Sequence, residues 1–310
     1  MGRRKHHLTR QQQIVTGWYL ANFCGPDGRL RVFGKDQVPR LEAPAKACRE
    51  RDFYEFEVNG RRTNNLYEDW LARLEDGAKS VLPKVMAREE LTSWEAATWS
   101  AFVASTFIRT RKYRHQISTA ITKGFGERSE SRDFVRGLQY ELFKAGILHS
   151  EAEVRSRIKE LRTAMEDSPS FYHVLGMPRH CHTLAEAVFR RSWHTLDAPP
   201  EMSFVTSDCP VVTVERTAHG WGLGSGFAKA ATIIFVPLTP AKLFVASAPH
   251  FGWKPLLTKV DVAMVNLAII QFAHKSIYAS VSSEELRRLV DWNINQVRFG
   301  DNAFLPGSTP

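Results

Sequence analysis

The residues of this chain whose types and spacing could do chemistry include one carboxylate set in a broken strand pattern. Thr206-Ser207-Asp208-Cys209-Pro210 interrupts a run of β-type residues with a polar triplet and a proline. Proline cannot donate to a sheet ladder, and Ser and Asp readily bond nearby backbone, so we expect Asp208 where a strand leaves its sheet. Strand ends often carry binding and catalytic groups. The alternative is a turn in which Asp208 only accepts bonds from the following amides.

Two glutamates form the second candidate set. Glu68 and Glu75 are seven residues apart, so both flank the same edge of a helical stripe of apolar residues. Carboxylates so placed could hold a divalent cation, Mg²⁺ or Mn²⁺, or share acid–base work. In the competing interpretation Glu75 pairs with Lys79 one helical turn away, and Glu68 is a solvated residue at the rim.

Histidines near the N-terminus are the third candidate. His6 and His7 follow the basic residues 3–5, which is typical of a mobile basic arm. Either histidine could act as a general acid or base if the apolar stretch Ile14 to Phe23 ties this end into the fold. His180-Cys181-His182 resembles a metal-ligand motif, but a lone run of this kind without partners elsewhere is a weak signal.

The elements that must position these residues follow from the hydropathy pattern. We predict that residues 1–310 form a single α+β domain, a central helical bundle packed on a small, mostly antiparallel sheet. Its parts are expected to be an N-terminal hairpin, a helical middle, a sheet-rich part and C-terminal helices, over residues 14–60, 64–168, 192–247 and 259–293.

Several local signals support these boundaries. Pro83 is expected to close the first long helix, and Thr92-Ser93-Trp94-Glu95 fits a capping box that begins the next. A helical pattern extends from Lys259 to Ala279, and in it Asn266 is the polar residue on a buried face. We expect Asn266 to find a hydrogen-bond partner inside the protein.

Bulk properties limit the classes of protein. The chain has 310 residues, 43% of them hydrophobic, which is ample for a substantial core. Its four cysteines are far apart, which favours free thiols in a reducing compartment, and no apolar run is long enough to span a bilayer, so we expect a cytoplasmic protein with no membrane partner. The net charge of +9 favours nucleic acid or another polyanion as partner, or else only a soluble basic surface.

Several of these pieces occur in one order that resembles the bacterial domain-of-unknown-function family 4238. The resemblance covers nearly the whole chain. Its specific parts are the Leu-x-Asn-Phe element ending at Phe23 and the Thr-Ser-Asp-x-Pro element at Asp208; its supporting parts are a near-terminal histidine, Glu68, Glu75, Arg109, Trp193, Pro237 to Pro240 and Asn266. The family commonly opens His-Tyr-Val-Pro-Gln, whereas here His6-His7-Leu8-Thr9-Arg10-Gln11 leads in, which leaves His6 and His7 as alternatives.

The resemblance implies no established activity, but it makes His, Glu, Arg and Asp the recurring polar types. Those types suit phosphodiester hydrolysis, with Glu68, Glu75 and Asp208 as metal or acid–base groups. A histidine would move a proton, and Arg109 would neutralise phosphate charge. We therefore expect an intracellular metal-dependent phosphodiesterase or nuclease, of the kind that serves as a toxin or phage-defence effector. The alternative is a non-catalytic nucleic-acid- or nucleotide-binding protein with a buried polar network.

Overall fold

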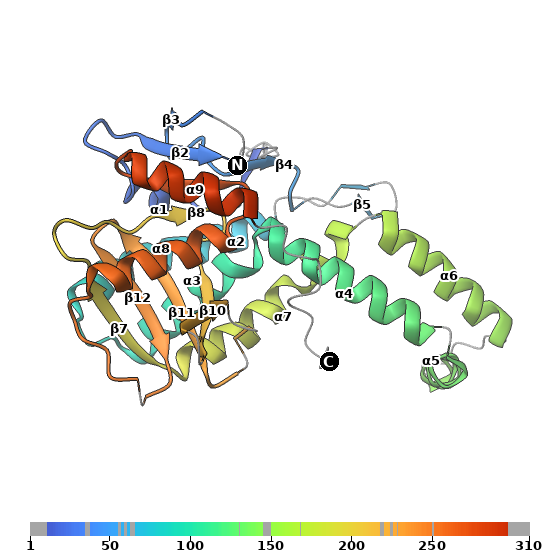
Figure 1. The fold of residues 1–310 in the computed structure, drawn as a ribbon. Helices are drawn as coiled ribbons and strands as arrows, with labels where there is room; N and C mark the ends of the chain where they lie inside the picture. Colours follow the sequence, from blue (N-terminus) through green and yellow to red (C-terminus); the bar gives the residue numbers. More distant parts are fainter. Residues whose placement is uncertain are drawn as a thin grey trace, which may run out of the picture.

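The part of the chain that the structure describes folds around a central antiparallel sheet (Figure 1). The structure is a computed structural model and describes residues 11–34, 38–54, 57–58, 61–62, 66–129, 131–144, 150–167, 169–217, 220–223, 226–227, 229–249 and 251–296. The helices in these ranges are α1 (Gly17–Ala21), α2 (Leu66–Ala87), α3 (Ser93–Ile108), α4 (Arg111–Ser129), α5 (Arg132–Lys144), α6 (Glu151–Asp167), α7 (Pro169–Phe189), α8 (Lys259–Phe272) and α9 (Glu284–Gln296).

The central sheet has five strands in the order β10-β9-β11-β12-β7, and each neighbouring pair is antiparallel. Their bounds are β7 Ser192–Asp197, β9 Val212–Thr217, β10 Gly220–Leu223, β11 Thr232–Thr239 and β12 Lys242–Ser247. β11 and β12 form a hairpin. The mixture of helices and antiparallel sheets confirms the α+β class expected from the sequence.

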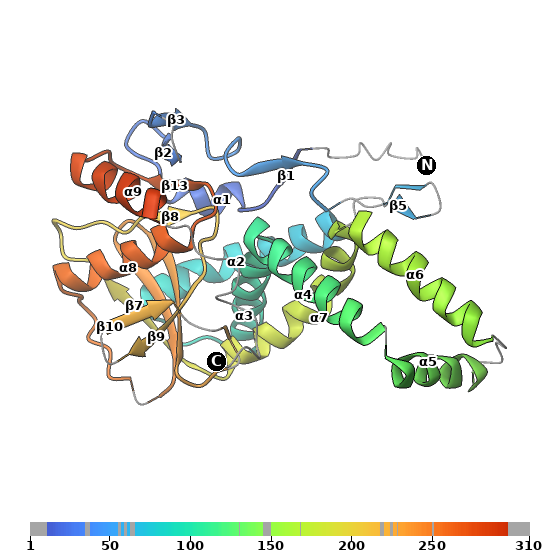
Figure 2. The ribbon, with the colours of Figure 1, turned by 45° about the vertical axis from the view of Figure 1, so that its right-hand side comes forward.

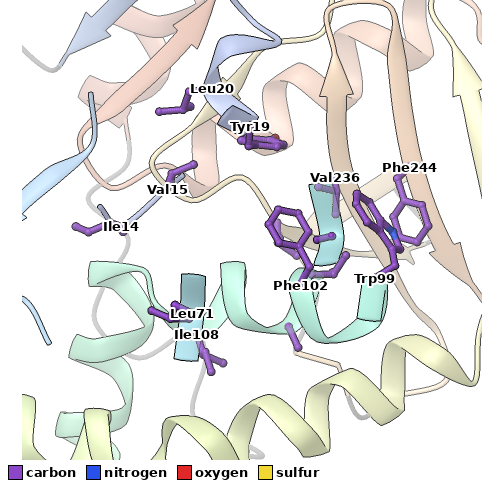
Figure 3. Close-up of a cluster of buried hydrophobic side chains, with 14 of the residues drawn as sticks. Ile14, Val15, Tyr19, Leu20, Leu71, Trp99, Phe102, Ile108, Val236 and Phe244 are labelled. Carbon is purple, nitrogen blue, oxygen red and sulfur yellow. The ribbon is translucent and has the colours of Figure 1, made fainter. Parts of the chain in front are cut away.

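Side chains alternate between the two faces of this sheet, and each face has its own apolar core. On β11, Ile233 and Phe235 belong to the core that includes α8, whereas Ile234 and Val236 belong to the core that includes α2, α3 and α7. In the second core Trp99 of α3 packs edge-on against Phe244 of β12, with ring centroids 5.7 Å apart (Figure 3).

A second sheet is built from segments far apart in sequence. It has the order β3-β2-β13-β8, with bounds β2 Leu30–Gly34, β3 Arg40–Glu42, β8 Thr206–Ser207 and β13 Ser276–Ala279. Tyr19 of α1 ties the two sheets together, because its hydroxyl donates to the Pro237 carbonyl at 2.6 Å and lies 2.9 Å from the Thr206 hydroxyl. Two shorter pairs complete the strands: β1 (Gln11–Gln13) with β4 (Arg49–Arg51), and β5 (Glu57–Val58) with β6 (Arg61–Arg62).

Two local predictions are confirmed by hydrogen bonds. The Thr92 hydroxyl accepts from the Glu95 N–H, and the Glu95 carboxylate accepts from the Thr92 N–H, so the capping box begins α3. Asn266 on α8 accepts from the Val205 N–H at 3.0 Å and donates to the Ser203 carbonyl at 2.8 Å. The polar residue on a buried helix face thus holds the strand-like segment that precedes β8.

Three predicted boundaries are wrong. Pro83 lies inside α2, which continues to Ala87. The helical middle extends beyond residue 168, because α7 runs to Phe189 with Pro178 inside it. The C-terminal helical pattern ends at Phe272, and Ser276–Ala279 is instead β13 between β2 and β8. Apolar side chains fit a buried strand as well as a helix, so only the neighbouring strands decide this last assignment.

The helices α4, α5 and α6 extend away from the central sheet as an arm (Figures 1 and 2). Val135 of α5 packs with Val154 and Ile158 of α6 in a small core of their own. In contrast, the segment that joins α3 to α4 stays against the body of the protein. This segment positions the polar site described below.

The core of α3 can be tested with two residues of the same helix. Phe102 is fully buried, whereas Trp94 in the first turn is 81% exposed. We expect Phe102→Ala to lower the free energy of unfolding by about 3–5 kcal/mol through cavity formation, and Trp94→Ala to change it by less than about 0.5 kcal/mol. Urea denaturation measures both. Equal effects would contradict the packing of α3 against the sheet.

Candidate active site between α2, α3 and the N-terminal segment

Arg109 is the centre of the polar site. It is the C-cap residue of α3, and its side chain is 1% exposed. Its guanidinium pairs with the Glu75 carboxylate of α2. Burial opposes the charge on Arg109, but the negative charge of Glu75 offsets it, so the pKa of Arg109 is raised. The pairing of Glu75 with Lys79, considered from sequence spacing, gives way to this longer-range ion pair.

Glu68 is the least satisfied carboxyl of the site. Burial raises its pKa to about 7, and the negative charge of Glu75 adds to the effect. One oxygen, Oε2, is enclosed and has no hydrogen-bond partner among the described residues. The two glutamates therefore do lie within electrostatic reach of each other, as their spacing on α2 predicted. Glu68 is a carboxyl that can gain and lose a proton near neutral pH.

Tyr54 and Arg49 bring the N-terminal segment to these helices. The Tyr54 N–H donates to the Gln12 side chain at 2.6 Å, and its hydroxyl donates to the Gln13 carbonyl at 3.1 Å. Burial raises the pKa of Tyr54, and the positive charge of Arg109 opposes that rise. Arg49 is exposed, and its positive charge acts to lower the pKa of Glu68. The positive charge of Arg49 thus acts on Glu68, opposed by the negative charges of Glu75 and Asp69.

The segment after Arg109 makes a second group of ion pairs. Arg111 and Arg114 of α4 both bond the Glu50 carboxylate of β4, the latter at 2.9 Å. Lys112 lies 3.8 Å from the centroid of the Phe272 ring at the end of α8 and donates to the Phe272 carbonyl at 3.3 Å. Burial lowers the pKa of Lys112. Cationic residues from 109 to 114 therefore contact α2, β4 and α8.

Asp208 lies at the end of β8, as expected, but both its oxygens are occupied. They accept the N–H groups of His274 and Lys275, each at 2.8 Å, and the Asp208 N–H donates to the Ser276 carbonyl at 3.0 Å. Burial raises the pKa of Asp208, and the two amide bonds oppose this. These amides belong to the turn that joins α8 to β13. The structure therefore assigns Asp208 to holding this turn.

The predicted metal ligands are not gathered into one set. In the ranges that the structure describes, no three His, Cys, Asp or Glu side chains lie close enough to hold a metal ion. Glu68 and Glu75 are neighbours, but Glu75 is bound to Arg109 and Asp208 to backbone amides. His6 and His7 lie outside the described residues. A requirement for Mg²⁺ or Mn²⁺ stays a prediction.

The sequence model of a family described as "Protein of unknown function (DUF4238)" matches residues 12–283. The chain belongs to the DUF4238 family. The matched range includes Glu68, Glu75, Arg109 and Asp208 but begins after His6 and His7. No curated protein and no solved structure matches the chain.

Two residues near this site, Tyr54 and Arg49, were not expected there from the sequence. Tyr54 falls within the expected N-terminal hairpin, residues 14–60, and Arg49 belongs to no motif. The only signal for them is the alternation in β4, where Arg49 and Arg51 are exposed and Glu50 between them turns toward α4. In the described part of this DUF4238 chain no helix is both long and apolar enough to cross a bilayer.

The Arg109–Glu75 pair can be tested by a double-mutant cycle. Arg109→Met leaves Glu75 without its counter-charge, so we expect the free energy of unfolding to fall by about 3–5 kcal/mol, and much of this loss to be restored in Arg109→Met/Glu75→Leu. Urea denaturation gives the coupling energy. The exposed pair Arg155 and Glu151 on α6 is the control, with a much smaller coupling because solvent screens it. A similar small coupling for Arg109 and Glu75 would refute the buried pair.

Glu68 predicts a pH dependence of stability. Its folded pKa of about 7 lies above the ordinary value of 4.5, so between these values the native state keeps a proton that the unfolded state has lost. Stability contributed by the protonated group is thus present at low pH and lost as pH rises to 7. We expect Glu68→Gln to gain about 1–2 kcal/mol over wild type between pH 5 and 8, after allowance for partial solvent exposure.

Urea denaturation at both pH values measures this gain. Glu285→Gln, at an exposed position on α9, is the control and should differ from wild type by the same amount at each pH. A Glu68→Gln difference that is constant from pH 5 to 8 would show that this carboxyl does not titrate there.

Proposed function

We propose that this protein hydrolyses phosphodiester bonds in nucleic acid and that Glu68 transfers the proton. The observation that carries the proposal is the environment of Glu68, a half-buried carboxyl whose pKa is raised to about 7 by burial, next to a buried Arg–Glu pair. Perturbed carboxyls of this kind occur preferentially at functional sites. A group with a pKa near the working pH is the most effective proton donor or acceptor.

The charges around Glu68 favour an anionic substrate. The positive charges of Arg109 and exposed Arg49 act on Glu68 against the negative charges of Glu75 and Asp69. Further along the chain, Arg111 and Arg114 share one counter-charge, Glu50. The net charge of +9 further attracts polyanions to the surface. Arg109 is enclosed and its charge is neutralised by Glu75, so it positions the carboxylates and does not contact phosphate. In this proposal Arg49 contacts the phosphate instead.

The proposed reaction needs one proton transfer that these residues can supply. Water attacks phosphorus and releases one proton to solvent, while the bond to the leaving oxygen breaks and protonated Glu68 donates its proton to that oxygen. Glu68 then regains a proton from solvent. Arg49 would stabilise the charge on the phosphate oxygens during this step. No step is assigned to a metal ion. A requirement for Mg²⁺ or Mn²⁺ and a role as a toxin or phage-defence effector are further predictions of this function.

A second candidate has its own support. Glu75, Glu50 and Asp208 are all satisfied by partners within the protein. Such a network is what a non-catalytic nucleic-acid-binding protein would use to hold its helices against its sheets. In that case Arg49 and the other exposed cations would bind nucleic acid, and the raised pKa of Glu68 would be a consequence of packing.

A degradation assay on RNA and DNA separates the two candidates. With wild type we expect cleavage that Glu68→Gln reduces by at least about 100-fold, the usual scale for loss of a general acid, while binding to the substrate is retained. Parallel reactions with Mg²⁺, Mn²⁺ or a chelator test the metal. Glu285→Gln is the matched control and should cleave like wild type.

Substrate binding provides the complementary measurement. Arg49→Ala should weaken nucleic-acid binding and reduce its salt dependence, because fewer counterions are released. Binding by wild type without cleavage under any metal condition would favour the binding protein. Cleavage that is unchanged in Glu68→Gln would exclude Glu68 as the proton donor.

A further inference from the structure

A cavity of about 310 Å³ lies beside β7, the outer strand of the central sheet. One wall is the end of α2 and the loop after it, with Arg88 and Leu91; the other includes Trp253. The cavity is separate from the Glu68 site, since α2 runs on for twelve residues after Glu75, a rise of about 18 Å. Nothing in the proposed hydrolysis uses it.

Two tryptophans with hydrogen-bonded indole N–H groups line the cavity, as does His194, whose Nε2 has no hydrogen-bond partner among the described residues. The Trp193 indole N–H donates to the Val188 carbonyl at 2.9 Å, and the Trp253 indole N–H donates to the Ser247 hydroxyl at 3.0 Å. Phe244 also lines the cavity and packs edge-on against Trp193. These rings therefore offer apolar and π surface to a ligand. Flat π systems are what such surfaces bind best.

The backbone of β7 supplies hydrogen-bonding groups beside these rings. The Asp197 N–H donates to the Pro255 carbonyl at 2.7 Å, and the Asp197 carbonyl accepts from the Leu257 N–H at 2.9 Å, so the backbone of Asp197 points outward from the sheet. Backbone direction alternates along a strand, which turns Trp193 and Thr195 outward as well. The Thr195 carbonyl confirms this, because Arg88 Nε donates to it at 2.8 Å.

Only a short part of the β7 edge is therefore open. Residues 255–257 cover it at Asp197, and Arg88 occupies the Thr195 carbonyl. Among the described residues, the outward backbone groups of this stretch left without a hydrogen bond are the N–H and carbonyl of Trp193 and the N–H of Thr195. This length is too short for an added peptide strand, but it suits a planar ligand that carries a donor and an acceptor on one edge.

Arg88 lines this end of the cavity and has an unusual backbone conformation. Its φ is +60°, at the position after α2 where a Schellman motif favours glycine. The Arg88 N–H bonds the Val85 carbonyl and the Glu89 N–H bonds the Lys84 carbonyl, which is the pattern of that motif. The arginine side chain explains why glycine is absent, because its guanidinium bonds Thr195 and Asp197.

We propose that this cavity binds a nucleobase or nucleoside, with the base against the indole rings and its hydrogen-bonding edge on the backbone of Trp193 and Thr195. Bases combine a flat π face with adjacent donors and acceptors, which matches both features of the cavity. A volume of about 310 Å³ is at the small end of ligand pockets, so a single base or nucleoside fits better than a dinucleotide. The inference does not depend on the proposed hydrolysis.

Isothermal titration calorimetry with adenosine, guanosine, cytidine and uridine tests the proposal on the full chain. We expect saturable binding of at least one nucleoside below about 1 mM, the weakest range that such a titration resolves. Leu91→Trp places a larger side chain in the cavity and should weaken this binding at least tenfold. If that variant fails to fold, Trp253→Leu removes one aromatic wall and should weaken binding similarly.

Two controls make the result specific. Trp94→Ala removes an exposed tryptophan that does not line the cavity and should bind within twofold of wild type. Glu68→Gln should also bind normally, which separates this site from the proposed active site. The proposal is overturned if no nucleoside binds, if binding is unchanged in Leu91→Trp and Trp253→Leu, or if free indole binds more tightly than every nucleoside.

Discussion

A buried guanidinium needs a negative charge next to it, and in this protein the buried guanidinium is that of Arg109 at the end of α3. Its partner Glu75 comes from α2, so the pair sets how α2 and α3 lie against each other. The same ion pair leaves Glu68 beside a carboxylate that is already committed, which contributes to the raised pKa of Glu68. Burial is the main cause of the raised pKa of Glu68, the negative charge of Glu75 adds to it, and the positive charge of Arg109 opposes it.

The residues after Arg109 extend this constraint to the rest of the fold. Arg111 and Arg114 hold β4 through Glu50, and Lys112 holds the end of α8 at Phe272. The turn after α8 is in turn fixed by Asp208 at the end of β8. The C-cap residue of α3 and the first turn of α4 thus link the N-terminal strands, the helical layer and α8. Arg109 both joins α3 to α2 and, through its positive charge, acts to lower the pKa of Glu68.

The two ends of α2 lie beside sites with different chemistry. The polar site lies where α2, α3 and the N-terminal segment meet, and the aromatic cavity lies at the opposite end of α2, against the outer strand β7. The first is rich in charge and the second in π surface. Arg88 lies at the cavity, where its side chain occupies the Thr195 carbonyl on the edge of β7. Only a few backbone groups of that edge are left for a ligand.

Sequence alone determined the features that depend on neighbouring residues: the capping box at Thr92, the need of Asn266 for an internal partner, and the placement of Glu68 and Glu75 on one side of α2. Tertiary structure decided the rest. Glu75 forms an ion pair with Arg109, 34 residues away, and Asp208 accepts hydrogen bonds from amides 66 and 67 residues away. Ser276–Ala279 is a strand only because β2 and β8 flank it. Local patterns report propensity and burial, whereas the partner of a charge or strand depends on which distant segments the fold brings beside it.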